Sequence, residues 1–246
     1  MLHRIMSILA IAVFCAIAAL IFWLVATGRG ETQLPRGVDT FAIKGIDISA
    51  HNGYVDFNAV KRAGYSFAMI KATEGATHKD KAFLQNALAA RRAGLRVGAY
   101  HFFRFDTPGY MQAINLLNSV RGMPLDMPIA IDVEEWTNPT DRSTESIVAE
   151  IEAMASKLKS EGWTVILYTN KDGYDRFIHR RLERYPLWLC SFNTPPDGKY
   201  HHTIWQFSHR GIIDGVDRLT DLNVFTGDSA TWDSMFVAPA AQYHAP

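Results

Sequence analysis

Between about residue 41 and residue 226, short apolar stretches of the chain alternate with longer amphipathic ones. Short apolar runs bounded by turn residues are typical of buried strands, and longer runs with a helical period are typical of helices. The pattern predicts strands at residues 43–48, 67–72, 97–101, 129–134, 165–169, 187–190 and 203–207, with a further strand within 212–224. It predicts helices at residues 57–63, 81–93, 110–120, 144–160 and 172–183.

Such alternation indicates an α/β fold with a parallel sheet, either open and doubly wound or closed into a barrel. A glycine follows four of the predicted helices, at Gly64, Gly94, Gly122 and Gly162, where a left-handed residue commonly ends a helix. Neither a G-x-G-x-x-G motif nor a Walker loop follows the first strand, so the nucleotide-binding open sheets lose support. We therefore predict an irregular TIM-like β/α barrel of about eight strands and about five helices, irregular because the last third is poor in helices.

The composition argues against several classes of protein. Acidic and basic side chains are equal in number among the 246 residues, so the charge gives no reason to expect a nucleic-acid partner. Of the two cysteines, Cys15 lies in the apolar N-terminal segment, which leaves Cys190 without a disulfide partner in the folded domain. We expect a monomer that needs neither a cofactor nor a resident metal.

Residues 5–26 form an apolar segment of 22 residues without a charge, which is long enough to span a bilayer. A cleaved secretory signal is the alternative, but its apolar region is normally about 7–15 residues and ends at a small-x-small site. We predict a membrane anchor over residues 1–27, a linker over 28–41, the barrel over 42–228 and a C-terminal tail over 229–246. With Arg4 on the cytoplasmic side, the barrel is expected outside the cytoplasm, in the periplasm or at the cell surface, and cleavage would make it secreted.

The run from Met127 to Glu135 places Asp132 and Glu134 two residues apart at the end of a predicted strand. Side chains alternate along a strand, so both carboxyls are expected on the same side. Two carboxyls held close together raise each other's proton affinity, which suits an acid and an anion that act on one bond. A solvated rim, a capping pair and a metal site are the alternatives for this pattern taken alone.

Other polar and aromatic side chains also lie at the ends of predicted strands. Barrel enzymes assemble their sites from the carboxyl ends of their strands, so these side chains are expected to converge on one face. The candidates are Asp47, Lys71, Glu74, His101, Asp132, Glu134, Tyr168, Trp188, Gln206 and Asp221. Each has an ordinary explanation by itself, such as a cap at Asp47, a rim ion pair between Lys71 and Glu74, or a core histidine at His101.

Seven segments of the chain resemble, in order, the signature blocks of the family-25 glycoside hydrolases, the N-acetylmuramidase lysozymes. The segments are GIDIS (45–49), IKATEG (70–75), GAYHFF (98–103), IAIDVE (129–134), LYTN (167–170), WQF (205–207) and DLNVF (221–225). The resemblance extends from about residue 43 to residue 226. It departs from the usual pattern at residues 187–192 and at Glu135 and Trp136, which bears on the preference for particular sugars more than on the chemistry.

The resemblance implies a modified β/α barrel that cleaves the β-1,4 bond between N-acetylmuramic acid and N-acetylglucosamine in the glycan strands of peptidoglycan. By position, Glu134 matches the general acid of the family, and Asp132, Asp47 and Asp221 match its supporting aspartates. We expect substrate-assisted catalysis, in which Asp132 orients the acetamido group of the sugar, and attack by Asp132 itself is the alternative. Substrate contacts are expected from the remaining strand-end side chains, which are Tyr168, Trp188, Gln206, Lys71, Glu74 and His101.

Two other classes of function fit parts of the same pattern. A metal-dependent hydrolase would use side chains of the same barrel face as ligands, namely Asp47, His51, His101, Asp132, Glu134 and Asp221. No H-E-x-x-H or comparably tight ligand spacing supports it. A membrane-held module that binds peptidoglycan without cleaving it is the second alternative, and the presence of both Asp132 and Glu134 argues against it.

Overall fold

The computed structural model describes residues 35–192 and 194–235, all within one compact unit. The segment 5–26, predicted to be a membrane anchor, lies outside these ranges. Within them, no helix is both long and apolar enough to cross a membrane.

Eight strands form a closed sheet in the described part of the chain. In order around it they are β1 (Lys44–Ile48), β2 (Tyr65–Glu74), β4 (Arg96–Phe102), β5 (Ile129–Asp132), β6 (Val165–Asn170), β7 (Leu187–Cys190), β8 (Ile204–Gly211) and β9 (Thr220–Phe225). Neighbours from β1 to β8 are parallel, whereas β9 is antiparallel to both β8 and β1 and closes the barrel. The two-residue strand β3 (His78–Lys79) pairs with β2 alone. The prediction of a TIM-like α/β barrel is confirmed.

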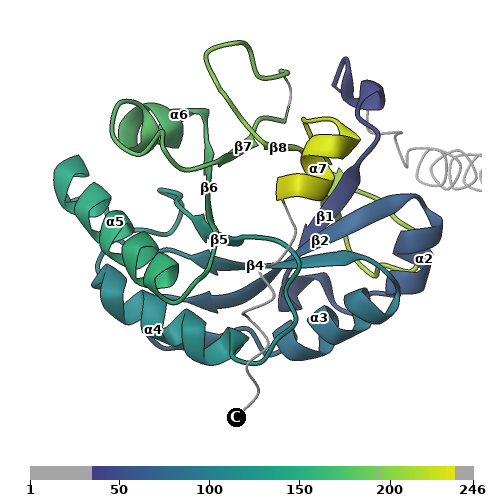
Figure 1. Cartoon of the computed structure of the whole chain (residues 1–246), viewed down its shortest axis with the longest axis horizontal. Coiled ribbons are helices and arrows are strands. Elements are labelled where there is room, and N and C mark those ends of the chain that lie inside the picture. Colours follow the sequence, from purple (N-terminus) through teal and green to yellow (C-terminus); the bar gives the residue numbers. More distant parts are fainter. Residues whose placement is uncertain (1–34, 193, 236–246) are drawn as a thin grey trace, which may run out of the picture. The chain divides into compact units, whose positions relative to one another are not determined.

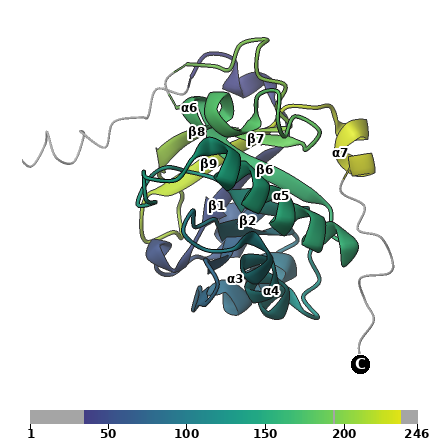
Figure 2. The ribbon, with the colours of Figure 1, turned by 90° about the vertical axis from the view of Figure 1, so that its left-hand side faces the viewer.

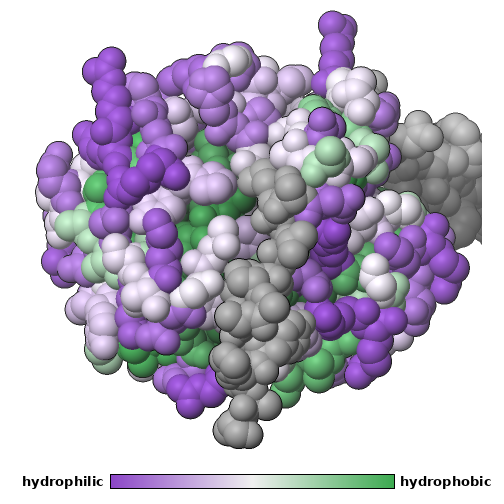
Figure 3. Space-filling model, in the orientation of Figure 1, coloured by the Kyte–Doolittle hydropathy of each residue, from purple (hydrophilic) through white to green (hydrophobic). Residues whose placement is uncertain are grey.

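The longer helices lie in an arc around the outside of the barrel (Figures 1 and 2). They are α2 (Phe57–Arg62), α3 (Phe83–Arg92), α4 (Gly109–Val120) and α5 (Thr144–Ser160). In α5, the buried residues Ile147, Ile151, Met154, Ala155 and Leu158 recur at helical spacing and form one apolar face. Ser143 caps its start by accepting a hydrogen bond from the backbone N–H of Ser146. The visible surface is hydrophilic over most of its outline (Figure 3).

The predicted helix at residues 172–183 is wrong in length. The structure has a short α6 (Lys171–Gly173) followed by the π-helical turn η3 (Tyr174–Ile178), after which the chain leaves the helix. His179 has φ of −56° and ψ of 126°, which is not helical, and Arg180 has φ of 60°. Leu182 and Tyr185 are buried in the same core as Ile178, and the chain turns back to bring them there.

The barrel interior has two layers. The lower layer, near the amino ends of the parallel strands, is apolar and consists of Ile43, Phe67, Met69, Met127, Ala130, Ile166, Ile204, Phe225 and Trp232. Trp232 comes from α7 (Ser229–Met235), and its ring lies 5.3 Å from that of Phe67 and 5.0 Å from that of Phe225. This helix falls within the segment 229–246, and the proposed boundary of a tail there stays a prediction.

The upper layer, near the carboxyl ends of the parallel strands, is polar. It comprises Asp47, Lys71, Tyr100, Asp132, Tyr168, Gln206, Asp221 and Asn223. Because side chains alternate along a strand, a single strand contributes to both layers at every second residue. Phe67, Met69 and Lys71 of β2 do so in turn, and Asp221, Asn223 and Phe225 of β9 do so in the opposite direction.

Candidate active site

A cavity of about 500 Å³ opens at the polar end of the barrel. It brings together side chains from most of the strand ends that the sequence singles out. The lining residues are Asp47, Ser49, His51, Lys71, Glu74, Tyr100, Phe102, Arg104, Asp132, Glu134, Trp136, Thr137, Tyr168, Trp188 and Asp221. All four carboxyl groups predicted to be catalytic are therefore in one cavity.

Asp47 of β1 and Asp221 of β9 are opposite each other in the antiparallel pair that closes the barrel. Asp47 Oδ2 accepts hydrogen bonds from the side-chain amides of Gln206 (2.8 Å) and Asn223 (2.7 Å), and Asp47 shares a further hydrogen bond with Asp221. Burial and the charge of Asp47 raise the pKa of Asp221 to about 9. Asp221 is therefore protonated near neutral pH. Burial also raises the pKa of Asp47, and the hydrogen bonds from the two amides oppose that rise by stabilising its negative charge.

Asp132 and Glu134 follow one another along the floor and wall of the cavity. Asp132 is buried, and its Oδ1 atom has no hydrogen-bond partner among the described residues. Burial and the charge of Glu134 raise the pKa of Asp132 well above its usual range. Burial and the charge of Asp47 raise the pKa of Glu134 to about 7. The pair can thus supply both a proton and a hydrogen-bond acceptor to a bound molecule near neutral pH.

The two aromatic residues predicted to contact sugar, Tyr168 and Trp188, form part of the cavity floor. They are 7% and 2% exposed, and their rings lie 4.6 Å apart. Tyr168 Oη donates to Gln206 Oε1 (2.8 Å), and Trp188 Nε1 donates to Asn223 Oδ1 (2.8 Å). Gln206 does not line the cavity, and it links Tyr168 to Asp47 instead.

Lys71 and Glu74 form an ion pair at the cavity wall, with Nζ and Oε2 2.8 Å apart. Burial alone would raise the pKa of Glu74, but the hydrogen bond and charge of Lys71 outweigh it and lower the pKa. Both side chains line the cavity, so the ion pair and a contact with substrate are compatible.

His101 does not reach the cavity. Its ring has no exposed surface and lies on the outer side of β4, where Nδ1 is 2.7 Å from Thr73 Oγ1 and Nε2 is 2.9 Å from Gln112 Oε1 of α4. Burial lowers the pKa of His101 to about 4, so it is neutral near pH 7. The geometry gives no support to the predicted substrate contact, because the alternation along β4 directs Tyr100 inward and His101 outward.

Several lining residues were not among the predicted site residues, including Tyr100, Arg104 and Trp136. Tyr100 lies two residues after Gly98 on the inward side of β4, so the strand period could have indicated it. Asn223, which holds both Asp47 and Trp188, lies two residues after Asp221 for the same reason. No group of three or more His, Cys, Asp or Glu side chains suited to a metal ion occurs among the described residues.

Comparison with known proteins agrees with this geometry. The profile of the Glycosyl hydrolases family 25 matches residues 46–216. The chain belongs to this family. It is therefore a glycoside hydrolase, as the signature blocks predicted.

Among curated relatives, the autolytic lysozyme of Clostridium acetobutylicum is 33% identical over 185 residues, which are 75% of this chain and 56% of that protein. Lysozyme M1 of Streptomyces globisporus is 32% identical over 221 residues, 82% of this chain and 74% of that protein. Among solved structures, a family 25 glycosyl hydrolase from Bacillus anthracis is 31% identical, with a TM-score of 0.78 over 85% of this chain and 100% of that one. This chain thus spans just over half the length of the clostridial relative.

Proposed function

We propose that this family 25 enzyme hydrolyses the β-1,4 bond between N-acetylmuramic acid and N-acetylglucosamine in peptidoglycan. The observation that carries the proposal is the set of four carboxyl groups gathered in one cavity, with Glu134 near a pKa of 7 beside the more deeply buried Asp132. The lysozymes among the relatives support the same substrate.

Glu134 serves as the general acid in this proposal. A glycosidic oxygen is a poor leaving group, so it must receive a proton as the bond breaks. A carboxyl group with a pKa of about 7 is largely protonated in mildly acidic solution and still gives up its proton readily. Asp132 and Asp221 have their pKa values raised further by burial, which suits them less well to donating a proton.

Asp132 assists by orienting the acetamido group of the sugar whose bond is cleaved. The carbonyl oxygen of that group attacks the anomeric carbon, the glycosidic bond breaks, and its oxygen takes the proton from Glu134. Water then opens the cyclic intermediate and gives a proton to the ionised Glu134, which restores the acid. The free Oδ1 atom of Asp132 is suited to accept the N–H of the acetamido group. Asp47, held by Gln206 and Asn223, places negative charge near the developing cation, and Asp221 holds Asp47 in place.

Digestion of purified peptidoglycan by the soluble protein from about residue 35 tests the proposal. The wild type is compared with Glu134→Gln, and the released ends are reduced with borohydride and analysed by mass spectrometry. Reduced muramic-acid ends from the wild type alone are expected. Reduced glucosamine ends would show cleavage of the other bond, and binding without release by either protein would point to a non-catalytic module.

We also propose that residues 1–27 anchor the chain in a membrane and that a linker over 28–41 holds the barrel, as a monomer, outside the cytoplasm. The uncharged segment 5–26 supports this placement. A linker of about fourteen residues reaches at most ~50 Å, so the enzyme would cut only glycan close to its membrane. Intact mass of the membrane-extracted protein tests the anchor, because loss of about 27 residues would show a cleaved signal.

A further inference from the structure

Trp136 is the most exposed large apolar side chain in the described part of the molecule, at 75%, and it lines the mouth of the catalytic cavity. It lies two residues after Glu134. Covering an exposed indole ring with the apolar face of a ligand is favourable, because it removes apolar surface from water. Trp136 offers such a surface at the mouth of the cavity, beside the proposed acid.

The backbone that carries Trp136 is fixed on both sides. Asn138 is buried and satisfies three backbone groups: Nδ2 donates to the carbonyl oxygens of Glu134 (2.8 Å) and Phe103 (2.9 Å), and Oδ1 accepts from the N–H of Phe105 (2.9 Å). This side chain thus ties the turn to the segment that follows β4.

Two arginines hold the residues on either side of the ring. Arg104 Nη1 donates to the carbonyl oxygen of Thr137 (2.8 Å), and the side chain of Arg176 pairs with that of Glu135. Thr137 has φ of 61°, a conformation that is unfavourable for a β-branched residue. Strain of this kind persists where the surroundings impose it, and it is concentrated at functional sites. The ring is therefore presented by a rigid turn.

Exposure increases along this segment from the cavity floor to its mouth. Asp132 is 6% exposed, Glu134 is partly buried, and Trp136 is 75% exposed. In the proposed mechanism Asp132 contacts the sugar whose bond breaks, and Glu134 reaches the glycosidic oxygen. The next position outward is then that of the departing sugar. Tyr168 and Trp188 offer this sugar almost no ring surface, because they are buried in the barrel.

We propose that Trp136 is the stacking platform for the sugar on the leaving-group side of the cleaved bond. The apolar face of an N-acetylhexosamine ring covers the indole. Because the turn is rigid, it fixes the position of the indole, and so of the stacked sugar, relative to Glu134. This assignment rests on the proposed function, and it makes Trp136 a determinant of how strongly the enzyme depends on a second sugar.

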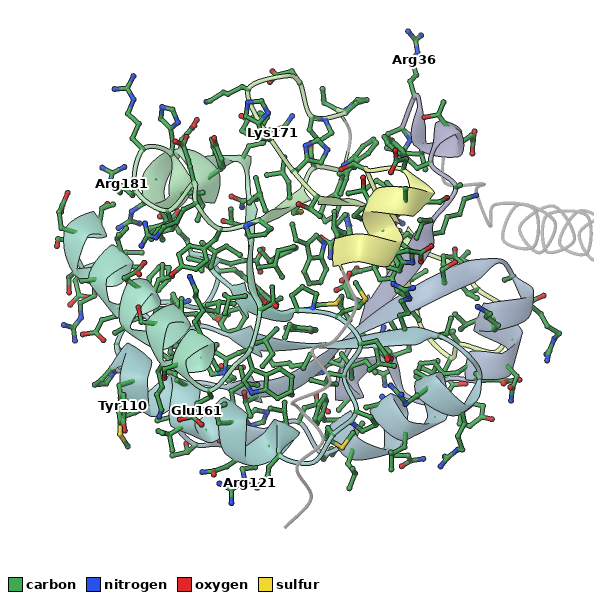
Figure 4. All side chains as sticks on the ribbon, viewed as in Figure 1. Arg36, Tyr110, Arg121, Glu161, Lys171 and Arg181 are labelled. Atoms are coloured by element: carbon green, nitrogen blue, oxygen red, sulfur yellow. The ribbon has the colours of Figure 1, made fainter. Side chains whose placement is uncertain are left out.

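The test compares two substrates. One is a soluble glycan fragment, and the other is the fluoride of the N-acetylglucosaminyl-N-acetylmuramic acid disaccharide, whose leaving group places no sugar on Trp136. For Trp136→Ala, the loss of kcat/KM on the glycan should exceed the loss on the fluoride by about tenfold. Trp136→Phe should recover most of the difference. Tyr110→Ala is the matched control, because Tyr110 is 53% exposed on α4 outside the cavity (Figure 4).

Equal losses on the two substrates would overturn the assignment to the leaving-group side, and no loss on the glycan would overturn the platform itself. Thermal unfolding of each variant identifies a folding defect. Binding of the glycan fragment to Glu134→Gln, with and without Trp136→Ala, provides a readout that needs no turnover. If the wild type cleaved neither substrate, the proposed function would fail. Even then, glycan binding about tenfold weaker to the double variant than to Glu134→Gln alone would support the platform.

Discussion

The lower and upper layers of the barrel interior are built by the same strands, yet they have opposite chemistry. The lower layer packs apolar side chains together, with Trp232 against Phe67 and Phe225, whereas the upper layer holds carboxyl groups whose pKa values burial has raised. Burial of apolar surface stabilises a fold, and burial of ionisable groups opposes it. The comparison indicates that the lower layer stabilises the barrel, whereas the buried carboxyl groups of the upper layer destabilise it and serve catalysis.

The largest expected effect is the loss of activity when the general acid Glu134 is removed. Glu134→Gln should lower kcat on peptidoglycan by about 10³-fold, because general acid catalysis contributes about 10²–10⁴-fold. Its free energy of unfolding should stay equal or rise, since a buried ionisable group is lost. Initial rates and thermal melts measure both quantities, and activity within tenfold of the wild type would contradict the role of Glu134.

The opposite result is expected in the lower layer. Trp232→Ala should reduce the free energy of unfolding by about 3–5 kcal/mol, because a buried tryptophan leaves a cavity. Its kcat at a temperature where it remains folded should be close to that of the wild type. Urea unfolding measures the change. Tyr54→Ala is the control, since Tyr54 is 65% exposed and its loss should change stability by at most about 0.5 kcal/mol.

The pH dependence of kcat/KM tests the chemistry of the upper layer directly, because it reports the pKa values of the free enzyme. Because the pKa of Glu134 is about 7, the acid is protonated below that pH and ionised above it. The value of kcat/KM should therefore fall about tenfold per pH unit above pH 7 as the proton is lost. A rate that fell already above pH 5 would show that the acid has an ordinary pKa and would exclude this assignment.

The smallest effect concerns stability in the upper layer. Between pH 3.8 and about 9, Asp221 is protonated in the folded state and ionised in the unfolded state, so unfolding releases a proton. The free energy of unfolding then falls as pH rises through this window. Asp221→Asn should reduce that slope and add about 1 kcal/mol at pH 7, at a cost in activity. Urea unfolding at several pH values checks it, and an unchanged slope would contradict the raised pKa.

Local patterns along the chain were enough to predict much of the fold and part of the site. Alternating apolar and amphipathic runs identified the eight strands and four of the five helices, because periodicity is a property of each segment by itself. The end of the helix at Ile178 was missed, since the residues after it turn back to bury Leu182 and Tyr185 in the same core as Ile178. The family resemblance alone was enough to identify the four carboxyl groups of the cavity.

By itself, the sequence determined the order of strands and helices, the family, and the strand ends at which polar side chains occur. Only the tertiary structure decided which of these side chains meet. The antiparallel return of β9 sets Asp221 against Asp47, and the alternation along β4 turns His101 toward α4. The turn after Glu134 exposes Trp136, while the barrel buries Tyr168 and Trp188. Burial, hydrogen bonding and pKa depend on neighbours that are remote in the chain, so no local pattern could fix them.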